Sequence, residues 1–342
     1  MNGLIMGFFD SSFQYFNGNY IVRLDSRKKF FKLEKRALRV DEELISEFPD
    51  SIDLKITDKC NHGCPFCHES STPKGKSLDL IETKRILSQL PKKPIEIAIG
   101  GGNVIECMDE LEDLCDWLRI RNHRPRITLN VRDLMGSYLD PKNERIVSLI
   151  TGKIGGLGVS LNSLDFIHEK VDDFDPLLKK KYFSQKVVRL LDRFPMGYEI
   201  GLSGTIIVYH IIAGIFPISE LDELLEKIKD ECLLILGYKQ WGRAKNDNLP
   251  NMEPWKEKLR EILERKNTNL NYIGFDNLAC EQLDIKNLVG EDIWKQVYFG
   301  DEGSCSMYID AVRGEFARTS RSSERVSWNK IGLLDYYASL RK

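Results

Sequence analysis

The segment Cys60-Asn61-His62-Gly63-Cys64-Pro65-Phe66-Cys67 decides how the rest of the chain is interpreted. Its three thiolates are close enough in sequence to reach one soft metal centre, and such a site selects an iron–sulfur cluster or zinc. Zinc sites usually contain two separated pairs of ligands, whereas here a three-residue gap and a two-residue gap share the central cysteine. The segment therefore predicts a centre that has three protein ligands and one open position.

This C-x3-C-x2-C spacing resembles that of the radical S-adenosylmethionine (radical SAM) enzymes. The resemblance implies a [4Fe–4S] cluster bound by Cys60, Cys64 and Cys67, with S-adenosylmethionine (SAM) on the fourth iron. In that family an electron from the cluster cleaves SAM to a 5′-deoxyadenosyl radical, which abstracts a hydrogen atom from the substrate. Phe66 matches the aromatic residue that lies beside the adenine in the family.

The alternative interpretation of the same cysteines is a zinc knuckle. A zinc ion would need a fourth ligand, and His62, His68 or the more distant Cys107 could supply it. Iron and inorganic sulfide content after anaerobic purification distinguishes the two kinds of site.

The composition and the apolar runs of the sequence indicate the general class of protein. The 342 residues include 50 basic and 52 acidic side chains, for a net charge of −2 and a pI near 6.3, so binding to nucleic acid is unsupported. Eight cysteines without a secretion signal are expected to be thiols or ligands and not disulfides. No apolar run reaches bilayer length, so we expect a soluble, cytoplasmic protein that does not contact membranes.

Strands alternate with helices from Ser51 onward, which predicts parallel βαβ units. The first strand leads directly into the cysteines, at the carboxyl end where the chemistry of a β/α barrel is located. Six such units predict an α/β fold of partial (β/α)6 TIM-like barrel type, open on one side. The predicted strands cover 52–57, 95–99, 126–131, 154–162, 198–212 and 232–239, and the predicted helices lie near 77–90, 111–118, 141–150, 184–194, 219–228 and 255–263.

Two additions flank the barrel. Alternating apolar residues at Tyr20–Leu24 and Lys29–Leu33 predict a small N-terminal β-hairpin that covers a barrel end or offers an edge to a partner strand. We expect three parts: an N-terminal β-rich addition over 1–50, a radical SAM partial barrel over 51–266, and a C-terminal α/β extension without an auxiliary cluster over 267–342.

Gly100, Gly101 and Gly102 directly follow the second predicted strand, where the absence of Cβ atoms lets the backbone approach a ligand closely. They resemble the family's second motif, whose backbone binds the amino group of SAM. Asn103 stands where that motif commonly has an acidic residue.

The resemblance implies further SAM contacts at the ends of later strands. Ser160 and Asn162 fall where family members hydrogen-bond the ribose or carboxylate of SAM, and a helix cap or turn is the alternative for both. Leu236 and Gly237 fall where the adenine packs. His210 is a candidate for substrate or SAM contact, or else a core residue with its hydrogen bonds satisfied.

The segment after 266 carries two isolated cysteines. Cys280 follows a predicted strand at 270–275 and could give a hydrogen atom to a substrate radical; alternatively it packs in a helix capped by Asp276 or Asn277. A predicted hairpin over 303–318 resembles a remnant of the cluster-binding extension of peptide-modifying members. Only Cys305, the second candidate catalytic thiol, remains there.

The reaction expected from this resemblance is hydrogen abstraction from a ribosomal peptide, leading to epimerisation or cross-linking. A second interpretation is a small anionic or nucleotide substrate bound by Lys239, Arg243 and the C-terminal arginines. A third is an activase that forms a glycyl radical on a partner enzyme, and a fourth is a non-enzymatic metal-binding module. A one-electron reductant such as flavodoxin or ferredoxin is the implied partner.

Overall fold

The computed structural model of the chain describes residues 12–25, 32–37, 44–134, 141–164, 206–228, 231–264, 272–298 and 300–341. Within these ranges ten strands form the main sheet and three form a smaller one. The six predicted barrel strands are present, each parallel to the next along the chain. They are β4 (Ser51–Thr57), β5 (Glu96–Gly101), β6 (Arg124–Asn130), β7 (Gly156–Leu161), β8 (Ile206–Ile212) and β9 (Cys232–Leu236).

The parallel sheet extends by one strand at each edge. The strand β10 (Tyr272–Phe275) pairs with β9, and β11 (Ser306–Asp310) pairs with β4, both in parallel. Two short antiparallel strands follow β11: β12 (Glu315–Ala317) and β13 (Val326–Ser327). In the described part of the chain β10 and β11 do not pair, so the sheet is a partial barrel with one open side, as predicted.

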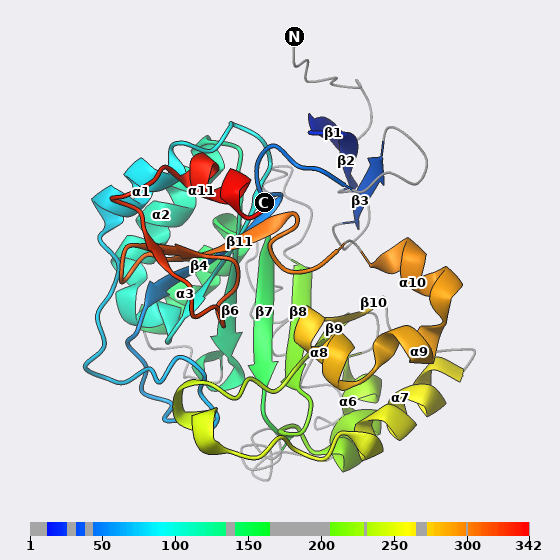
Figure 1. Ribbon diagram of the computed structural model, residues 1–342. Helices are drawn as coiled ribbons and strands as arrows, with labels where there is room; N and C mark the ends of the chain where they lie inside the picture. Colours follow the sequence, from blue (N-terminus) through cyan, green and yellow to red (C-terminus); the bar gives the residue numbers. More distant parts are fainter. Residues whose placement is uncertain are drawn as a thin grey trace, which may run out of the picture.

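Helices cover the outer face of the sheet (Figure 1). Those of the barrel are α1 (Leu80–Leu87), α2 (Met108–Ile120), α3 (Pro141–Gly152), α6 (Leu221–Lys227) and α7 (Glu253–Glu264). Those of the C-terminal part are α8 (Asn277–Gln282), α9 (Ile285–Val289), α10 (Glu291–Val297) and α11 (Leu333–Ser339). The helix predicted over 184–194 lies outside the described residues. No helix among the described residues has both the length and the apolar character needed to cross a membrane.

Local sequence signals explain the boundaries of several elements. The Asp79 carboxylate accepts a hydrogen bond from the Glu82 N–H at 3.0 Å and so begins α1, and Asp276 begins α8 in the same way. A short 3₁₀ turn, Ile218–Glu220, precedes α6, and no side chain caps that helix.

Strand β4 alternates between the two faces of the sheet. Ile52, Leu54 and Ile56 are fully buried in the core. The intervening Asp53 and Lys55 side chains therefore point to the inner side of the barrel. The inner face of the sheet is thus polar where the outer face is apolar.

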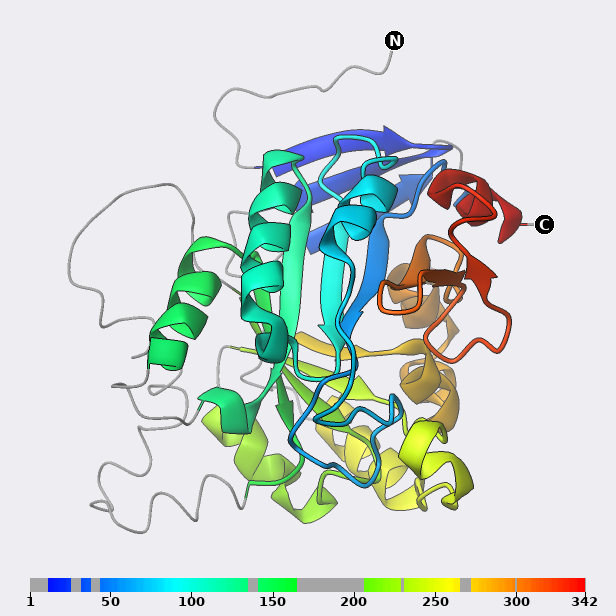
Figure 2. The same cartoon turned by 90° about the vertical axis from the view of Figure 1, so that its left-hand side faces the viewer.

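The N-terminal addition is a three-stranded antiparallel sheet and not the two-stranded hairpin expected. Its strands are β1 (Ser12–Asn17), β2 (Tyr20–Asp25) and β3 (Lys32–Ala37). It lies beyond the amino ends of the parallel strands (Figure 2). Buried Asp50, just before β4, accepts hydrogen bonds from Asn17 Nδ2 at 2.7 Å and Tyr20 Oη at 2.6 Å, which fixes the small sheet to the barrel.

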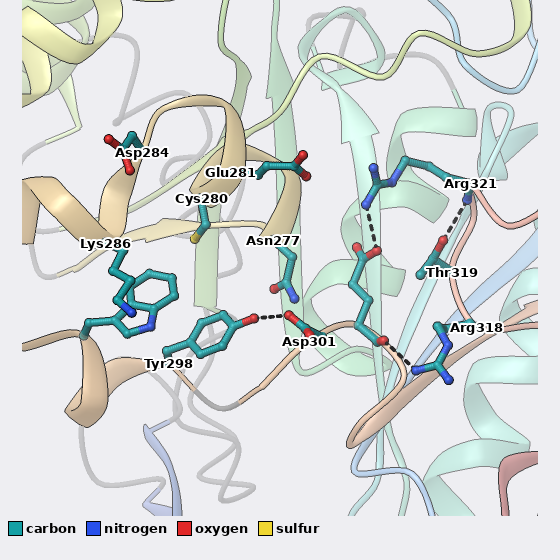
Figure 3. A pocket seen from close by; sticks show the side chains of 12 residues that line it. Asn277, Cys280, Glu281, Asp284, Lys286, Tyr298, Asp301, Arg318, Thr319 and Arg321 are labelled. Atoms are coloured by element: carbon teal, nitrogen blue, oxygen red, sulfur yellow. Dashed lines mark hydrogen bonds and ion pairs between the residues drawn. The ribbon is translucent and has the colours of Figure 1, made fainter. Parts of the chain in front are cut away.

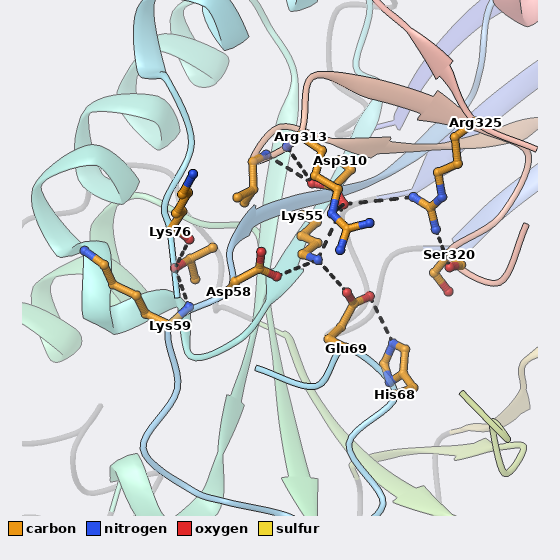
Figure 4. Close-up of polar contacts among 12 residues, drawn as sticks. Lys55, Asp58, Lys59, His68, Glu69, Lys76, Asp310, Arg313, Ser320 and Arg325 are labelled. Carbon is orange, nitrogen blue, oxygen red and sulfur yellow. Dashed lines mark hydrogen bonds and ion pairs between the residues drawn. The ribbon is translucent and has the colours of Figure 1, made fainter. Parts of the chain in front are cut away.

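One buried ammonium group on β4 joins the cysteine loop that follows this strand to the distant strand β11 (Figure 4). Lys55 Nζ lies 2.6 Å from Asp58 and 2.6 Å from Glu69, which both belong to the cysteine loop (residues 58–72). It also lies 3.4 Å from Asp310, at the end of β11. The Lys55 side chain is only 3% exposed.

The charges in this cluster stabilise one another. Burial alone would lower the pKa of Lys55, but Glu69, Asp58 and Asp310 raise it above its ordinary value, so the side chain stays charged. Burial would likewise raise the pKa of Glu69, but a hydrogen bond from His68 and the charge of Lys55 lower it to about 2. The cysteine loop and the C-terminal hairpin are therefore joined through one cation.

Replacing this lysine tests its structural role. The substitution Lys55→Met should lower the free energy of unfolding by about 3–5 kcal/mol, because it leaves buried carboxylates without a counter-charge. Urea denaturation of the cluster-free protein measures the change. Lys84→Met is the matched control: it removes an ion pair with the exposed Asp113 carboxylate, 2.7 Å away, and should cost less than about 1 kcal/mol. Equal losses in the two variants would contradict the role given to Lys55.

Candidate functional site

The cysteine loop leaves the carboxyl end of β4 and is closed at its base by backbone hydrogen bonds. The Cys60 N–H donates to Thr72 O at 3.0 Å, and the Thr72 N–H donates back to Asp58 O at 3.0 Å. The Asp58 N–H donates to Lys76 O at 2.7 Å. These contacts return the chain to its starting point, so the three cysteines lie on a single closed loop.

The three cysteines of this loop are free and partly exposed. The Cys67 N–H donates to Cys64 O at 3.2 Å, which forms a tight turn between the second and third thiols. Burial raises the pKa of Cys60, a hydrogen bond from the His62 N–H opposes it, and the charges of Cys64 and Cys67 raise it further. The three thiols are therefore near enough to repel one another as thiolates, a repulsion that a bound cationic iron centre would offset.

The donor set fits an iron–sulfur cluster. Three free cysteines on one loop supply the soft thiolate ligands that such a cluster takes.

The three side chains considered as a fourth zinc ligand contact other protein groups. His62 Nε2 lies 3.0 Å from Asp133 Oδ2, and His68 Nε2 lies 3.4 Å from Glu69 Oε1. Cys107 is buried, its thiol contacts Val104 O at 3.3 Å, and burial raises its pKa to about 11. Cys107 is therefore the least suited of the three to bind a metal.

The glycines after β5 pack directly against the start of the cysteine loop. A Cβ on Gly101 would lie 2.4 Å from Thr57 O, and one on Gly102 would lie 2.2 Å from Lys59 O, so only glycine fits at either position. A Cβ on Gly100 would meet nothing within 4 Å. Gly100 thus borders free space at the end of β5, where the sequence predicts SAM.

Asn103, which replaces the acidic residue of the motif, has a structural role. It is buried, and its Nδ2 donates to Asp133 Oδ1 at 3.0 Å and lies 3.3 Å from His62 Nε2. An amide can contact both groups at once, whereas a carboxylate here would face the Asp133 carboxylate. Asn103 therefore suits its surroundings here better than the acidic residue that the family motif commonly has at this position.

The polar end of β7 lies beside the candidate site. Ser160 is half-buried and pairs in register with Asn130 on β6 and His210 on β8. Neither Ser160 nor the half-buried Asn162 makes a side-chain hydrogen bond with another described residue, so both retain hydrogen-bonding capacity for a ligand. Burial and then the charge of Arg126 lower the pKa of His210 to about 4, so its imidazole is neutral at pH 7.

The other predicted SAM residues occupy different environments. Leu236 ends β9 and is half-buried. Gly237 is buried, and its N–H donates to Asp276 Oδ1 at 2.9 Å, which ties the end of β9 to the start of α8. Phe66 is partly buried and packs against the core.

Sequence reasoning missed Asp53, which faces the interior of the barrel. Its register neighbours are Ala98 on β5 and Tyr308 on β11. Among the described residues its carboxylate has no hydrogen-bond or ion-pair partner, and it is exposed to solvent within the barrel. An isolated Asp in an apolar strand carries no motif, so only the alternation of β4 could have indicated its direction.

The pKa of Asp53 is shifted by its position inside the barrel. The surrounding barrel wall raises the pKa of Asp53, and the charge of Lys239 opposes that effect. Three other carboxylates raise it further, to about 6: Glu302, Glu96 and Asp276. Asp53 is thus an acidic side chain that titrates near neutrality inside the barrel.

The two candidate catalytic thiols lie in different surroundings. Cys280 is half-buried, and burial followed by the charge of Asp276 raises its pKa to about 11, so it is a neutral thiol. It lines a pocket of about 520 Å³ between α8, α10 and the segment after β12 (Figure 3). Cys305 is 6% exposed, and its sulfur lies 3.6 Å from Tyr20 Oη. That environment favours a packing role for Cys305.

The cationic residues proposed for an anionic substrate contact protein groups. Arg243 Nε and Nη1 donate to the carbonyls of Cys64 and Ser71, and Lys239 Nζ donates to Ser320 Oγ at 3.1 Å. Three of the C-terminal arginines are engaged as well: Arg318 with Leu340 O, Arg321 with Glu302, and Arg325 with the Ser320 and Ser322 carbonyls. The fourth, Arg313, is 64% exposed and lies 3.9 Å from Asp310.

Known proteins share this architecture. The family model for the radical SAM superfamily matches residues 54–229, just over half of the chain. No curated protein sequence matches the chain.

The solved structures with the same fold are distant in sequence. SuiB of Streptococcus suis bound to the precursor peptide SuiA is 14% identical with a TM-score of 0.56, and the alignment covers 86% of this chain and 65% of that one. SuiB bound to SAM is 15% identical with a TM-score of 0.57, covering 87% and 69%. The structure of anSMEcpe with bound AdoMet and the Cp18Cys peptide is 13% identical with a TM-score of 0.50, covering 85% and 79%.

At these identities the likeness shows the fold, whereas the family model also matches the sequence around the cysteine loop. The cysteine loop at the end of β4 and its three free thiols are the features that this family requires. The chain therefore belongs to the radical SAM superfamily and is an enzyme whose cofactors are a [4Fe–4S] cluster and S-adenosylmethionine.

Proposed function

We propose that this enzyme abstracts a hydrogen atom from a ribosomally made peptide and so epimerises or cross-links it. The observation that supports the proposal most directly is the pocket at the open side of the sheet (Figure 3). Its volume of about 520 Å³ lies within the roughly 300–1,000 Å³ typical of ligand sites. An opening in the side of a barrel can admit one residue of a long chain while the remainder stays outside.

The walls of the pocket suit a peptide. One wall carries the stacked rings of Trp294 and Tyr298, whose centroids are 4.2 Å apart. The opposite wall carries Glu302 paired with Arg321 at 3.1 Å. Apolar rings facing polar side chains can contact both a side chain and a peptide backbone. The structure of SuiB with its precursor peptide gives the same class of substrate for a protein of this fold.

A small anionic substrate has less support. Such a substrate needs cations that are free to bind it. Arg243 and Arg318 donate to backbone carbonyls, and Arg321 pairs with Glu302. Among the described residues, the Asp53 carboxylate inside the barrel has no partner, and its charge would repel an anion.

Each residue of the site has a proposed role in this chemistry. The proposal assigns the cluster to Cys60, Cys64 and Cys67. The residues proposed to contact SAM are Phe66, Gly100, Gly101, Gly102, Ser160, Asn162, Leu236 and Gly237. When bound, the two cofactors supply the 5′-deoxyadenosyl radical. A one-electron reductant protein is the second proposed partner.

Each of the three parts of the chain has its own proposed role. Residues 51–266 would hold the cofactors, and residues 267–342 would complete the substrate pocket without a second cluster. The N-terminal addition, 1–50, would cover the amino end of the barrel.

A direct assay tests the proposed substrate class. Anaerobic incubation of the reconstituted enzyme with SAM, a reductant and peptides encoded beside its gene should yield 5′-deoxyadenosine and a peptide changed in mass or chirality. Mass spectrometry and chiral amino-acid analysis measure the two changes. A variant with all three loop cysteines replaced by alanine should yield neither product. Unaltered peptide across the panel, together with SAM-dependent turnover of a small molecule, would refute a peptide substrate.

The glycines after β5 provide a matched pair of variants for the SAM site. Gly102→Ala should lower the free energy of unfolding by about 1–3 kcal/mol, because the new methyl group overlaps Lys59 O. Gly100→Ala should change stability by less than about 0.5 kcal/mol, because its methyl group enters free space, yet weaken SAM binding. Urea denaturation and calorimetric titration with SAM measure these effects. Normal SAM affinity in Gly100→Ala would exclude Gly100 from the SAM site.

The two candidate thiols can be compared in deuterated water. In an epimerisation, the peptide carbon radical would take a hydrogen atom from the Cys280 S–H group, and the resulting thiyl radical would regain one electron and one proton from the reductant and solvent. Cys280→Ala should therefore reduce deuterium in the product to background, whereas Cys305→Ala, at a buried position, should leave it unchanged. The reverse pattern would assign the transfer to Cys305, and no effect in either variant would exclude both thiols.

A further inference from the structure

The segment after β9 reaches back across the barrel mouth and contacts the cysteine loop. The Arg243 N–H donates to Cys67 O at 3.0 Å. Its side chain donates through Nε to Cys64 O at 2.7 Å and through Nη1 to Ser71 O at 2.8 Å. One residue thus binds three carbonyls of a loop that lies far away in the sequence.

The residue before it makes this close approach possible. Gly242 has a φ of +59°, which favours glycine, and a Cβ there would lie 2.4 Å from His68 O and 2.6 Å from Cys67 O. Any other side chain would push the segment away from the loop. Gly242 therefore allows the close approach, and Arg243 makes the hydrogen bonds to the backbone of the cysteine loop.

These contacts act on the turn that carries two of the cluster ligands. The loop has its own local hydrogen bond, from the Cys67 N–H to Cys64 O, but that bond does not fix the turn relative to the barrel. The hydrogen bonds from the Arg243 guanidinium are charge-assisted and anchor the turn to the segment that follows β9. Leu236 and Gly237, at the end of that strand, are the residues proposed to contact the adenine of SAM.

We propose that Arg243 is a positioning residue for the iron–sulfur cluster: it holds Cys64 and Cys67 in the ligating arrangement and keeps a positive charge beside them. This role differs from the anion-binding role considered for Arg243 from the sequence. It depends on the cofactor of the family and not on the peptide substrate, so it can succeed or fail independently of the proposed function.

The test compares variants of the anaerobically reconstituted holoenzyme. Arg243→Met keeps the length of the side chain and removes its donors and charge, whereas Arg243→Lys keeps the charge and some donor capacity. Iron and sulfide per chain, the rate of iron loss to a ferrous chelator and the midpoint potential of the cluster are measured. Lys245→Met is the matched control, because Lys245 is exposed in the same turn and has no hydrogen-bond or ion-pair partner among the described residues.

Arg243→Met should lose iron to the chelator at least about tenfold faster than the unmodified enzyme, a loss like that seen when groups that orient metal ligands are removed. Its midpoint potential should fall, because a nearby positive charge favours the reduced cluster. Arg243→Lys should keep the potential and lose iron at an intermediate rate, and Lys245→Met should match the unmodified enzyme.

Unchanged chelation rate and potential in Arg243→Met would overturn the proposal, and so would equal changes in Lys245→Met. Thermal unfolding of each cluster-free variant checks that the fold is intact. If Arg243→Met does not fold, Gly242→Ala decides the question, because it keeps the guanidinium but displaces the segment from the loop. Faster iron loss in Gly242→Ala would support the proposal, and a normal rate would refute it.

Discussion

The pairing of one buried cation with carboxylates from separate segments is the constraint on which the cysteine loop depends. Lys55 contacts Asp58 and Glu69 within the loop and Asp310 on β11. In a poorly solvated interior, none of these groups can lose its partners without a large cost in free energy. The loop therefore has one favourable position relative to the sheet, which a cluster with only three protein ligands requires.

Backbone contacts, in addition to the ion pairs of Lys55, fix the position of the cysteine loop. On one side Gly101 and Gly102 bring the end of β5 against the loop, and on another Gly242 and Arg243 bring the segment after β9 against it. Contacts between main-chain atoms leave little room for adjustment, since no side-chain rotation can relieve a clash. The site is thus rigid where the cluster ligands are held and open where Gly100 and Ser160 face the interior.

Much of this arrangement could be predicted from short-range patterns. The spacing of the cysteines identified the loop, and the alternation of strand-like with helix-like segments identified the parallel strands from β4 to β9. Each of these signals is contained within a few neighbouring residues, where the physics of a turn or a strand acts.

The missed features all depend on residues that are distant in sequence. The contacts of Lys55 with Asp310 and of Arg243 with Cys64 join opposite parts of the chain, and no periodicity reports them. The environment of Asp53 could not be predicted either, because it is formed by side chains that lie on or after other strands. The third strand of the N-terminal sheet, β1, was missed because its residues Ser12–Asn17 include polar side chains and no clear alternation.

The parallel pairing of β11 with β4 also has a consequence for how the protein is made. The strand that carries the cysteine loop is translated well before its neighbour in the sheet and the partner Asp310. A pairing between such remote segments must overcome a large loop-closure entropy before it contributes any stability. A nascent chain that has exposed only its first βα units therefore lacks the anchors of the metal site, and we expect maturation with iron and sulfide to follow the translation of β11.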